Sequence, residues 1–122
     1  MSQTTPHTPL LNAIVEGMQD NKAKNISILD MHGIEGAIAD YFVICDCSST
    51  TQTDATADSV WDKVFELTGE KPRHDEGRTN AQWILLDYVD TVVHIFLQPV
   101  REYYNLETLW GDAQRSDIPD LD

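Results

Sequence analysis

Trp83-Ile84-Leu85-Leu86-Asp87-Tyr88-Val89-Asp90 is the stretch that decides the fold of this chain of 122 residues. An apolar run ends there in an acidic turn, and a second apolar run, Val92 to Phe96, follows directly. Two short apolar runs separated by a turn are typical of a β-hairpin. The sequence therefore predicts paired strands over 83–88 and 91–97.

The first strand of this hairpin has large apolar side chains on both faces. Successive side chains of a strand point to opposite sides. Alternation therefore divides the strand into two sets: Trp83, Leu85 and Asp87 on one face, and Ile84, Leu86 and Tyr88 on the other. One face should pack on helices, and the other should be covered by the terminal helix or offered to a partner.

Outside the hairpin, apolar spacing and capping residues indicate the remaining elements. Leu10, Leu11, Ile14, Val15 and Met18 recur at helical spacing. Ser48 to Thr50 offers cap chemistry for a second helix, and Gly69 should end it. The predicted elements are helices over 9–21 and 50–67, strands over 25–30, 41–45 and 71–74, and helical segments over 99–104 and 106–110.

This order of elements predicts an α/β fold of the α+β type, with a single mixed five-stranded sheet flanked by helices. The length fits one domain over 1–122, with a core from about 9 to 111. Residues 1–8 and 115–122 are rich in polar residues and proline, so we expect both ends to be flexible.

The net charge of −13, from 21 acidic and 8 basic residues, argues against a broad phosphate-binding face. We expect little direct contact with nucleic acid. An acidic body suits a basic protein partner, although solubility alone would also explain the charge. The sequence predicts no membrane span and no secretory signal. With only Cys45 and Cys47, it predicts no disulfide framework, and a cytoplasmic location follows.

Candidate catalytic residues are few. Asp30, Asp40, Asp87 and Asp90 stand at predicted strand ends, where paired carboxylates could hold Mg²⁺ for phosphoryl transfer. A nucleotide-binding or nucleotidyltransferase-like enzyme is therefore the alternative to weigh. Residues 45–51 contain neither glycine nor lysine for a triphosphate, so turn chemistry is the better interpretation. We expect no enzyme activity and no cofactor.

Metal binding is also not expected, because the histidines and cysteines lack the close pairing of zinc sites. His94 lies inside an apolar strand and is interpreted as a hydrogen-bonded, semi-buried histidine. Among the aromatics, Trp61 and Phe96 suit core packing. Trp83, Tyr88, Tyr103, Tyr104 and Trp110 gather in the final segments, and tryptophan and tyrosine are favoured interface anchors.

Short motifs from Leu10 to Trp110 resemble, in order and spacing, the Iojap family of ribosomal silencing factors (RsfS). The resemblance is carried by Asp40 to Cys45, Ser49 and Gln52 with Ala57-Asp58, Glu76-Gly77, Trp83 to Asp87, Val93 to Phe96, and the pattern Arg101, Tyr104, Leu106-Glu107, Leu109-Trp110. None of these motifs is specific by itself, but their joint order is.

The resemblance implies a nucleotidyltransferase-like topology that lacks the catalytic residues. It also implies binding to the large ribosomal subunit through ribosomal protein fourteen, which blocks joining of the small subunit and represses translation when nutrients are short. A role in large-subunit assembly and a homodimer are further implications. The residues expected to face the partner are Trp83, Tyr88, Tyr104, Leu109 and Trp110.

Overall fold

A computed structural model describes residues 8–121, so of the flexible end predicted for residues 1–8, all but Thr8 lies outside the described part. Within residues 8–121, no helix has the length and apolar character needed to cross a membrane. The elements are α1 (Pro9–Asp20), β1 (Lys24–Asp30), β2 (Tyr41–Cys47), α2 (Thr50–Thr68), β3 (His74–Glu76), β4 (Trp83–Asp87), β5 (Thr91–Leu97), α3 (Gln98–Tyr104), α4 (Leu106–Leu109) and β6 (Gln114–Ile118).

The two long helices begin at the capping residues that the sequence indicates. Thr8 precedes α1, and its side chain accepts a hydrogen bond from the Leu11 amide in the first turn. The Ser49 side chain does the same for the Gln52 amide at α2, and Gly69 follows the last turn of α2. These caps satisfy amides that have no partner inside the helix, which explains where each helix begins.

One mixed sheet organises the chain, with strand order β3-β4-β5-β2-β1-β6. Strands β2 and β5 run parallel, and the other neighbours are antiparallel. The predicted hairpin is confirmed as β4 and β5, with Trp83 opposite Phe96 and Asp87 opposite Val92. The α/β class is confirmed, but the described part of the chain forms a sheet of six strands instead of the predicted five.

The sixth strand, β6, lies where the sequence predicts a flexible end at 115–122. Its backbone pairs with β1, from Ile26 opposite Ile118 to Asp30 opposite Gln114. Ser27 also donates a hydrogen bond from Oγ to the Asp117 carboxylate over 2.7 Å. An edge strand needs only one paired side and can consist of polar residues. The sequence analysis missed this strand, which includes residues 115–118 of the predicted flexible end, because such a strand carries no apolar signal.

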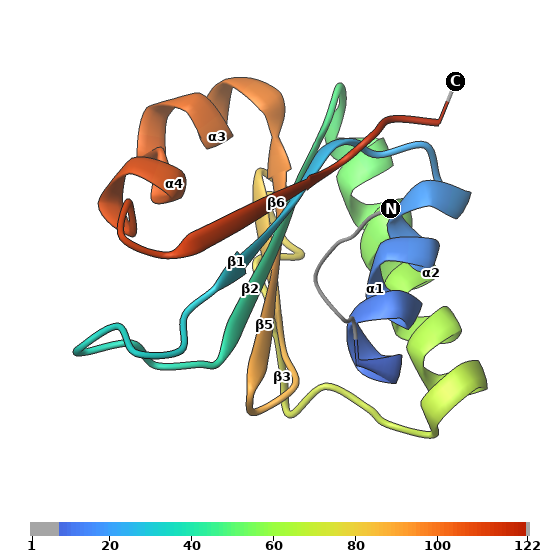
Figure 1. The fold of residues 1–122 in the computed structure, drawn as a ribbon. Coiled ribbons are helices and arrows are strands. Elements are labelled where there is room, and N and C mark those ends of the chain that lie inside the picture. The colour runs from blue at the N-terminus through green and yellow to red at the C-terminus, as the bar shows by residue number, and fades with distance from the viewer. Residues whose placement is uncertain (1–7, 122) are drawn as a thin grey trace.

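Helices α1 and α2 together cover one face of the sheet (Figure 1). The main core lies between them and the strands, and it includes Ile84, Leu86 and Tyr88 of the hairpin region. The two helices approach closely at Gly17, where an added Cβ would lie 2.7 Å from the Cα of Val60. This close packing makes α1 and α2 a continuous layer behind the hairpin.

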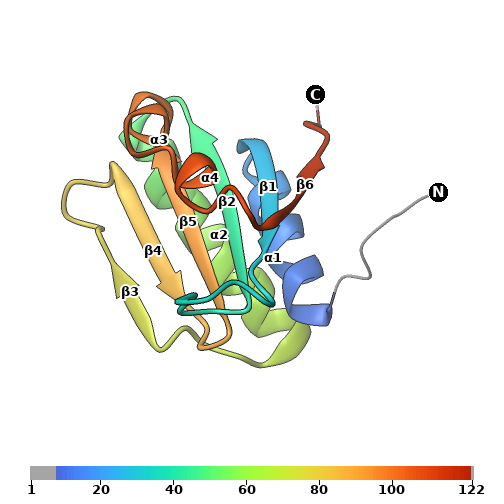
Figure 2. The same ribbon diagram turned by 60° about the vertical axis from the view of Figure 1, so that its left-hand side comes forward.

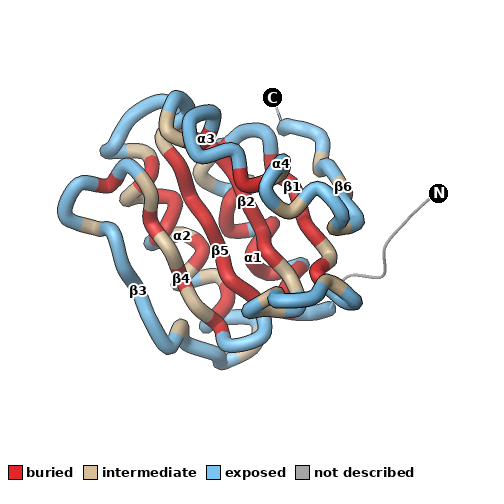
Figure 3. The backbone as a smooth tube through the Cα atoms, turned by 90° about the vertical axis from the view of Figure 1, so that its left-hand side faces the viewer, coloured by how far each residue is buried: buried red, intermediate tan, exposed pale blue. Residues whose placement is uncertain are grey.

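The opposite face of the sheet is covered only in part. Helices α3 and α4 lie over one end of it, and the loop between β1 and β2 lies near the other end (Figure 2). A second core cluster, including Phe42, Ile44, Val92, Phe96 and Leu106, forms on this face. Figure 3 shows β5 and β2 buried in the centre, while α3 and β3 are exposed around them. We call this side of the sheet the second face.

Candidate docking surface

Aromatic rings form a connected series across the second face, which we call the aromatic row: Tyr103, Tyr104, Trp83, Phe96, His94, Phe42 and Trp110. The centroid distances along it are 5.1 Å for Tyr103–Tyr104, 4.7 Å for Tyr104–Trp83, 4.9 Å for Trp83–Phe96, 4.6 Å for Phe42–His94 and 6.2 Å for Phe42–Trp110. The row joins three strands to the C-terminal helical segment.

The aromatic row is buried in its middle and open at its ends. Phe42, His94 and Phe96 are buried, whereas Tyr104 is 49% exposed. Trp83 and Trp110 are half-buried, so each ring has a packed side and an accessible side. Aromatic groups fixed in this way lose little conformational entropy when a partner covers them, which is the property of an interface anchor.

The structure brings four of the five predicted site residues to the second face or its rim. Trp83 and Trp110 pack against the second core cluster, Tyr104 contacts Trp83, and Leu109 on α4 is 69% exposed. The fifth prediction, Tyr88, was wrong as a surface anchor. Tyr88 is only 3% exposed and packs in the main core, on the side of α1 and α2. Alternation along the hairpin strand explains this, because it sets Tyr88 opposite to Trp83.

His94 accepts a hydrogen bond at Nδ1 from the indole Nε1 of Trp83 over 3.1 Å. The histidine is 4% exposed, and burial lowers its pKa to about 4, although Glu107 acts in the opposite direction. His94 is therefore neutral near pH 7, and its proton sits on Nε2 because Nδ1 is the acceptor. The interpretation of His94 as a hydrogen-bonded buried histidine is confirmed.

The depressed pKa of His94 predicts loss of stability in mild acid. The unfolded chain binds this proton near pH 6.5, whereas the folded chain binds it near pH 4. The stabilisation is thus complete above about pH 6.5 and is lost as the pH falls towards 4. Between about pH 7.5 and 5, urea unfolding should lose about 2 kcal/mol from this group.

The control for this pH effect is His94→Asn, which removes the titrating group. His32, whose hydrogen bond to Asp30 raises its pKa, is present in both proteins. The difference between the two pH curves therefore isolates His94. Parallel curves for the two proteins would contradict the prediction.

A buried ion cluster, which we call the Arg101 cluster, fastens the C-terminal helical segment to the sheet. The Arg101 guanidinium lies 3.1 Å from the Asp46 carboxylate and 2.5 Å from that of Glu107. It also donates to the Asn25 carbonyl and to Ser27 Oγ. Burial raises the pKa of Asp46, while Asn25 and Arg101 act in the other direction. The cluster joins α3 and α4 to β1 and β2.

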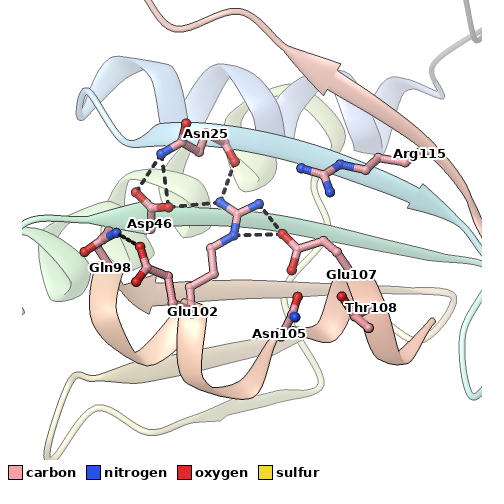
Figure 4. Close-up of a pocket in the computed structure, with 9 residues that line it drawn as sticks. Asn25, Asp46, Gln98, Glu102, Asn105, Glu107, Thr108 and Arg115 are labelled. Atoms are coloured by element: carbon pink, nitrogen blue, oxygen red, sulfur yellow. Dashed lines mark hydrogen bonds and ion pairs between the residues drawn. The ribbon is translucent and has the colours of Figure 1, made fainter. Parts of the chain in front are cut away.

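Residues of the Arg101 cluster line a polar hollow of about 370 Å³. In Figure 4, Asn25 and Asp46 approach from the strands, and Glu107 approaches from the helical segment. Gln98, Glu102 and Arg115 lie around the hollow. Both acidic and basic groups line the hollow, and its central arginine is already paired. We therefore interpret the hollow as part of the contact between the C-terminal helical segment and the sheet, and not as a ligand site.

The aspartates at the strand ends have local partners. Asp30 accepts from the His32 backbone amide over 3.0 Å, and its carboxylate lies 2.7 Å from the His32 ring. Asp87 accepts from Arg73 over 3.1 Å, and Asp90 accepts from the Thr91 hydroxyl over 3.2 Å. Within residues 8–121, no three histidine, cysteine, aspartate or glutamate side chains gather so as to hold a metal ion.

Comparison with known proteins gives one consistent family. The model of the family described as "Ribosomal silencing factor during starvation" matches residues 3–122. The ribosomal silencing factor RsfS of Bacillus subtilis is 41% identical over 109 residues, which cover 89% of this chain and 91% of that protein.

A more distant relative and a solved structure extend this match. The mouse protein named "Mitochondrial assembly of ribosomal large subunit protein 1" is 29% identical over 105 residues, covering 82% of this chain and 44% of that protein. A crystal structure from Chromobacterium violaceum superposes with a TM-score of 0.77 at 32% identity, covering 84% of this chain and 83% of that one.

Proposed function

The chain belongs to the family of ribosomal silencing factors, and on this premise we propose that it docks on the large ribosomal subunit through ribosomal protein fourteen. The docked protein occupies the surface that the small subunit needs and so represses translation when nutrients are short. The family is one of regulatory proteins rather than known enzymes. The name of the mouse relative supports the large subunit as the target and an additional role in its assembly.

The observation that carries this proposal is the aromatic row. Trp83 and Tyr104 are in contact and are accessible, while the rings beneath them are fixed in the core. A rigid aromatic centre surrounded by polar groups is the usual composition of a protein interface. The net charge of −13 favours a basic protein as the partner, since opposite potentials speed encounter and fix orientation.

Inhibition in this proposal is steric, and it requires no chemical step. The protein acts in the cytoplasm, where ribosomal subunits assemble and join. A homodimer, which the family resemblance implies, stays a prediction. If its contact used the aromatic row, dimerisation and docking would compete for Trp83 and Tyr104.

Substituting the central anchors should abolish docking while the fold is retained. For Trp83→Ala and Tyr104→Ala we expect a loss of about 2 kcal/mol or more, roughly thirtyfold in affinity, because each removes a ring from the centre of the contact. Co-sedimentation with purified large subunits measures docking, and circular dichroism checks the fold. Both variants should also fail to prevent joining of the two subunits.

Phe65→Ala is the matched control. Phe65 lies on α2, outside the aromatic row, and is 48% exposed, close to the value for Tyr104. Its removal should leave co-sedimentation unchanged. If Trp83→Ala and Tyr104→Ala still followed the large subunit, or if Phe65→Ala weakened binding equally, the docking surface would have to be placed elsewhere.

A further inference from the structure

We propose that His94 is a positioning residue for Trp83: its buried Nδ1 holds the indole in the orientation that the partner binds. This inference rests on the proposed docking function. His94 would then have a role in docking, although it takes part in neither catalysis nor metal binding. Two observations support this role: the geometry of the contact between His94 and Trp83, and the unpaired second nitrogen of His94. A third argument is that the Trp83 indole could change its orientation without this hydrogen bond.

The geometry fixes the acceptor before the partner arrives. His94 on β5 lies opposite Leu85 of β4, and Trp83 lies opposite Phe96, so the two rings are diagonal neighbours on the second face. Their centroids are 5.9 Å apart, and Trp83 donates to His94 over 3.1 Å. The Phe42 ring meets His94 edge-on at 4.6 Å, which holds the imidazole in place.

The second nitrogen of His94 argues against a role in stability alone. Nε2 is buried and has no hydrogen-bond partner among the described residues. A neutral imidazole that accepts at Nδ1 must carry its proton on this unpaired Nε2. Burying an unpaired polar group is unfavourable, so an apolar side chain of similar size would be more stable at this position. What an apolar side chain could not supply is the acceptor for Trp83.

Trp83 needs this acceptor because stacking alone leaves the indole free to turn. Its ring lies against Phe96 at 4.9 Å and Tyr104 at 4.7 Å. The Phe96 ring is stacked on the indole and the Tyr104 ring is tilted by 46°, and such ring contacts persist at more than one setting of the Trp83 side-chain torsions, whereas a hydrogen bond is directional. Since Trp83 is half-exposed, an indole without an acceptor would turn its N–H towards water.

Two substitutions of His94 separate positioning from stability. His94→Leu fills the site with an apolar side chain and removes the acceptor. The free energy of unfolding should be unchanged or higher, whereas the affinity for the large subunit should fall roughly three- to tenfold. His94→Asn replaces Nδ1 with the amide oxygen but leaves space where the ring was. It should be less stable than His94→Leu and should nevertheless dock within about twofold of the original protein.

The measurements are urea unfolding, binding titrations with purified large subunits and the NMR signal of the Trp83 indole proton, assigned with Trp83→Phe. This proton should exchange slowly with solvent in the original protein and in His94→Asn, and rapidly in His94→Leu. The inference is overturned if docking follows stability across the variants, or if His94→Leu docks as the original protein does.

Trp83→Ala distinguishes this outcome from a failure of the proposed function. If Trp83→Ala weakens docking and His94→Leu does not, only the role of His94 is wrong. If Trp83→Ala docks normally, the docking surface itself is wrong.

Discussion

Replacing Arg101 with methionine should cost about 3–5 kcal/mol of unfolding free energy, a large part of the stability of a domain of this size. The guanidinium pairs with Asp46 and Glu107, whose side chains are only 9% and 12% exposed. Methionine fills similar space but leaves two carboxylates in a poorly solvated site. Removing one partner of a buried ion pair is far more damaging than never having had the pair.

The same substitution should weaken docking beyond its effect on stability. Arg101 is on α3, and Glu107 is on α4 beside Leu109. Without the Arg101 cluster, the segment that carries Tyr104 and Trp110 loses its ionic connection to β2. Urea unfolding gives the stability, and co-sedimentation at a temperature where the variant is folded gives the docking.

Two comparisons make the Arg101 prediction specific. Arg115→Met removes an exposed pair with Asp117, with side chains 46% and 64% exposed, and should cost about 1 kcal/mol or less. Combining Arg101→Met with Asp46→Asn and Glu107→Gln removes the unpaired charges and should recover most of the loss. A loss below about 1 kcal/mol for Arg101→Met alone would show that the cluster does not hold the segment.

The sequence reveals the centre of this fold because local patterns determine it. Alternation over 83–88 predicts both the hairpin and the division of its side chains, with Ile84 and Leu86 in the main core and Trp83 and Leu85 against the second cluster. The edge strands are harder to predict in this way: the strand expected over 71–74 lies at His74–Glu76, and β6 was not predicted. β3 is three exposed residues, and β6 is exposed or half-exposed throughout, so neither has an apolar period.

The docking surface could be predicted in part, because residue type and strand alternation are local features of the sequence. Trp83 and Tyr104 stand out by residue type, and the structure brings them into contact. Tyr88 shows the limit of residue type, because the alternation that places Trp83 on one face places Tyr88 on the other.

The Arg101 cluster could not be predicted from local patterns. Arg101 and Asp46 are 55 positions apart and meet only when α3 folds back over β2. Of the two, only Arg101 stands in the motifs that carry the family resemblance, and those motifs do not say which residues pair. The hydrogen bond from Trp83 to His94 has a clearer origin, since hairpin register alone makes the two residues diagonal neighbours.

Gly77→Ala should be the second most damaging substitution, at a cost of about 3 kcal/mol. Gly77 follows β3 with a φ of 92°, a conformation that strains any residue with a Cβ. An added Cβ would also lie 2.1 Å from the Trp83 carbonyl oxygen and 3.2 Å from the Cα of Ile84. Both are backbone atoms of a paired strand, so neither can move aside without displacing β4.

Gly36→Ala separates these two effects. Gly36 has a φ of 84°, but nothing lies within 4 Å of the added Cβ. Its substitution therefore carries only the conformational strain, partly offset by the reduced freedom of the unfolded chain, and should cost about 1 kcal/mol. The difference between the two variants in urea unfolding measures the clash with β4. Equal losses of unfolding free energy in the two variants would mean that the β4 backbone moves at Trp83 without cost. A strand that moves there could not hold the indole in one orientation for a partner.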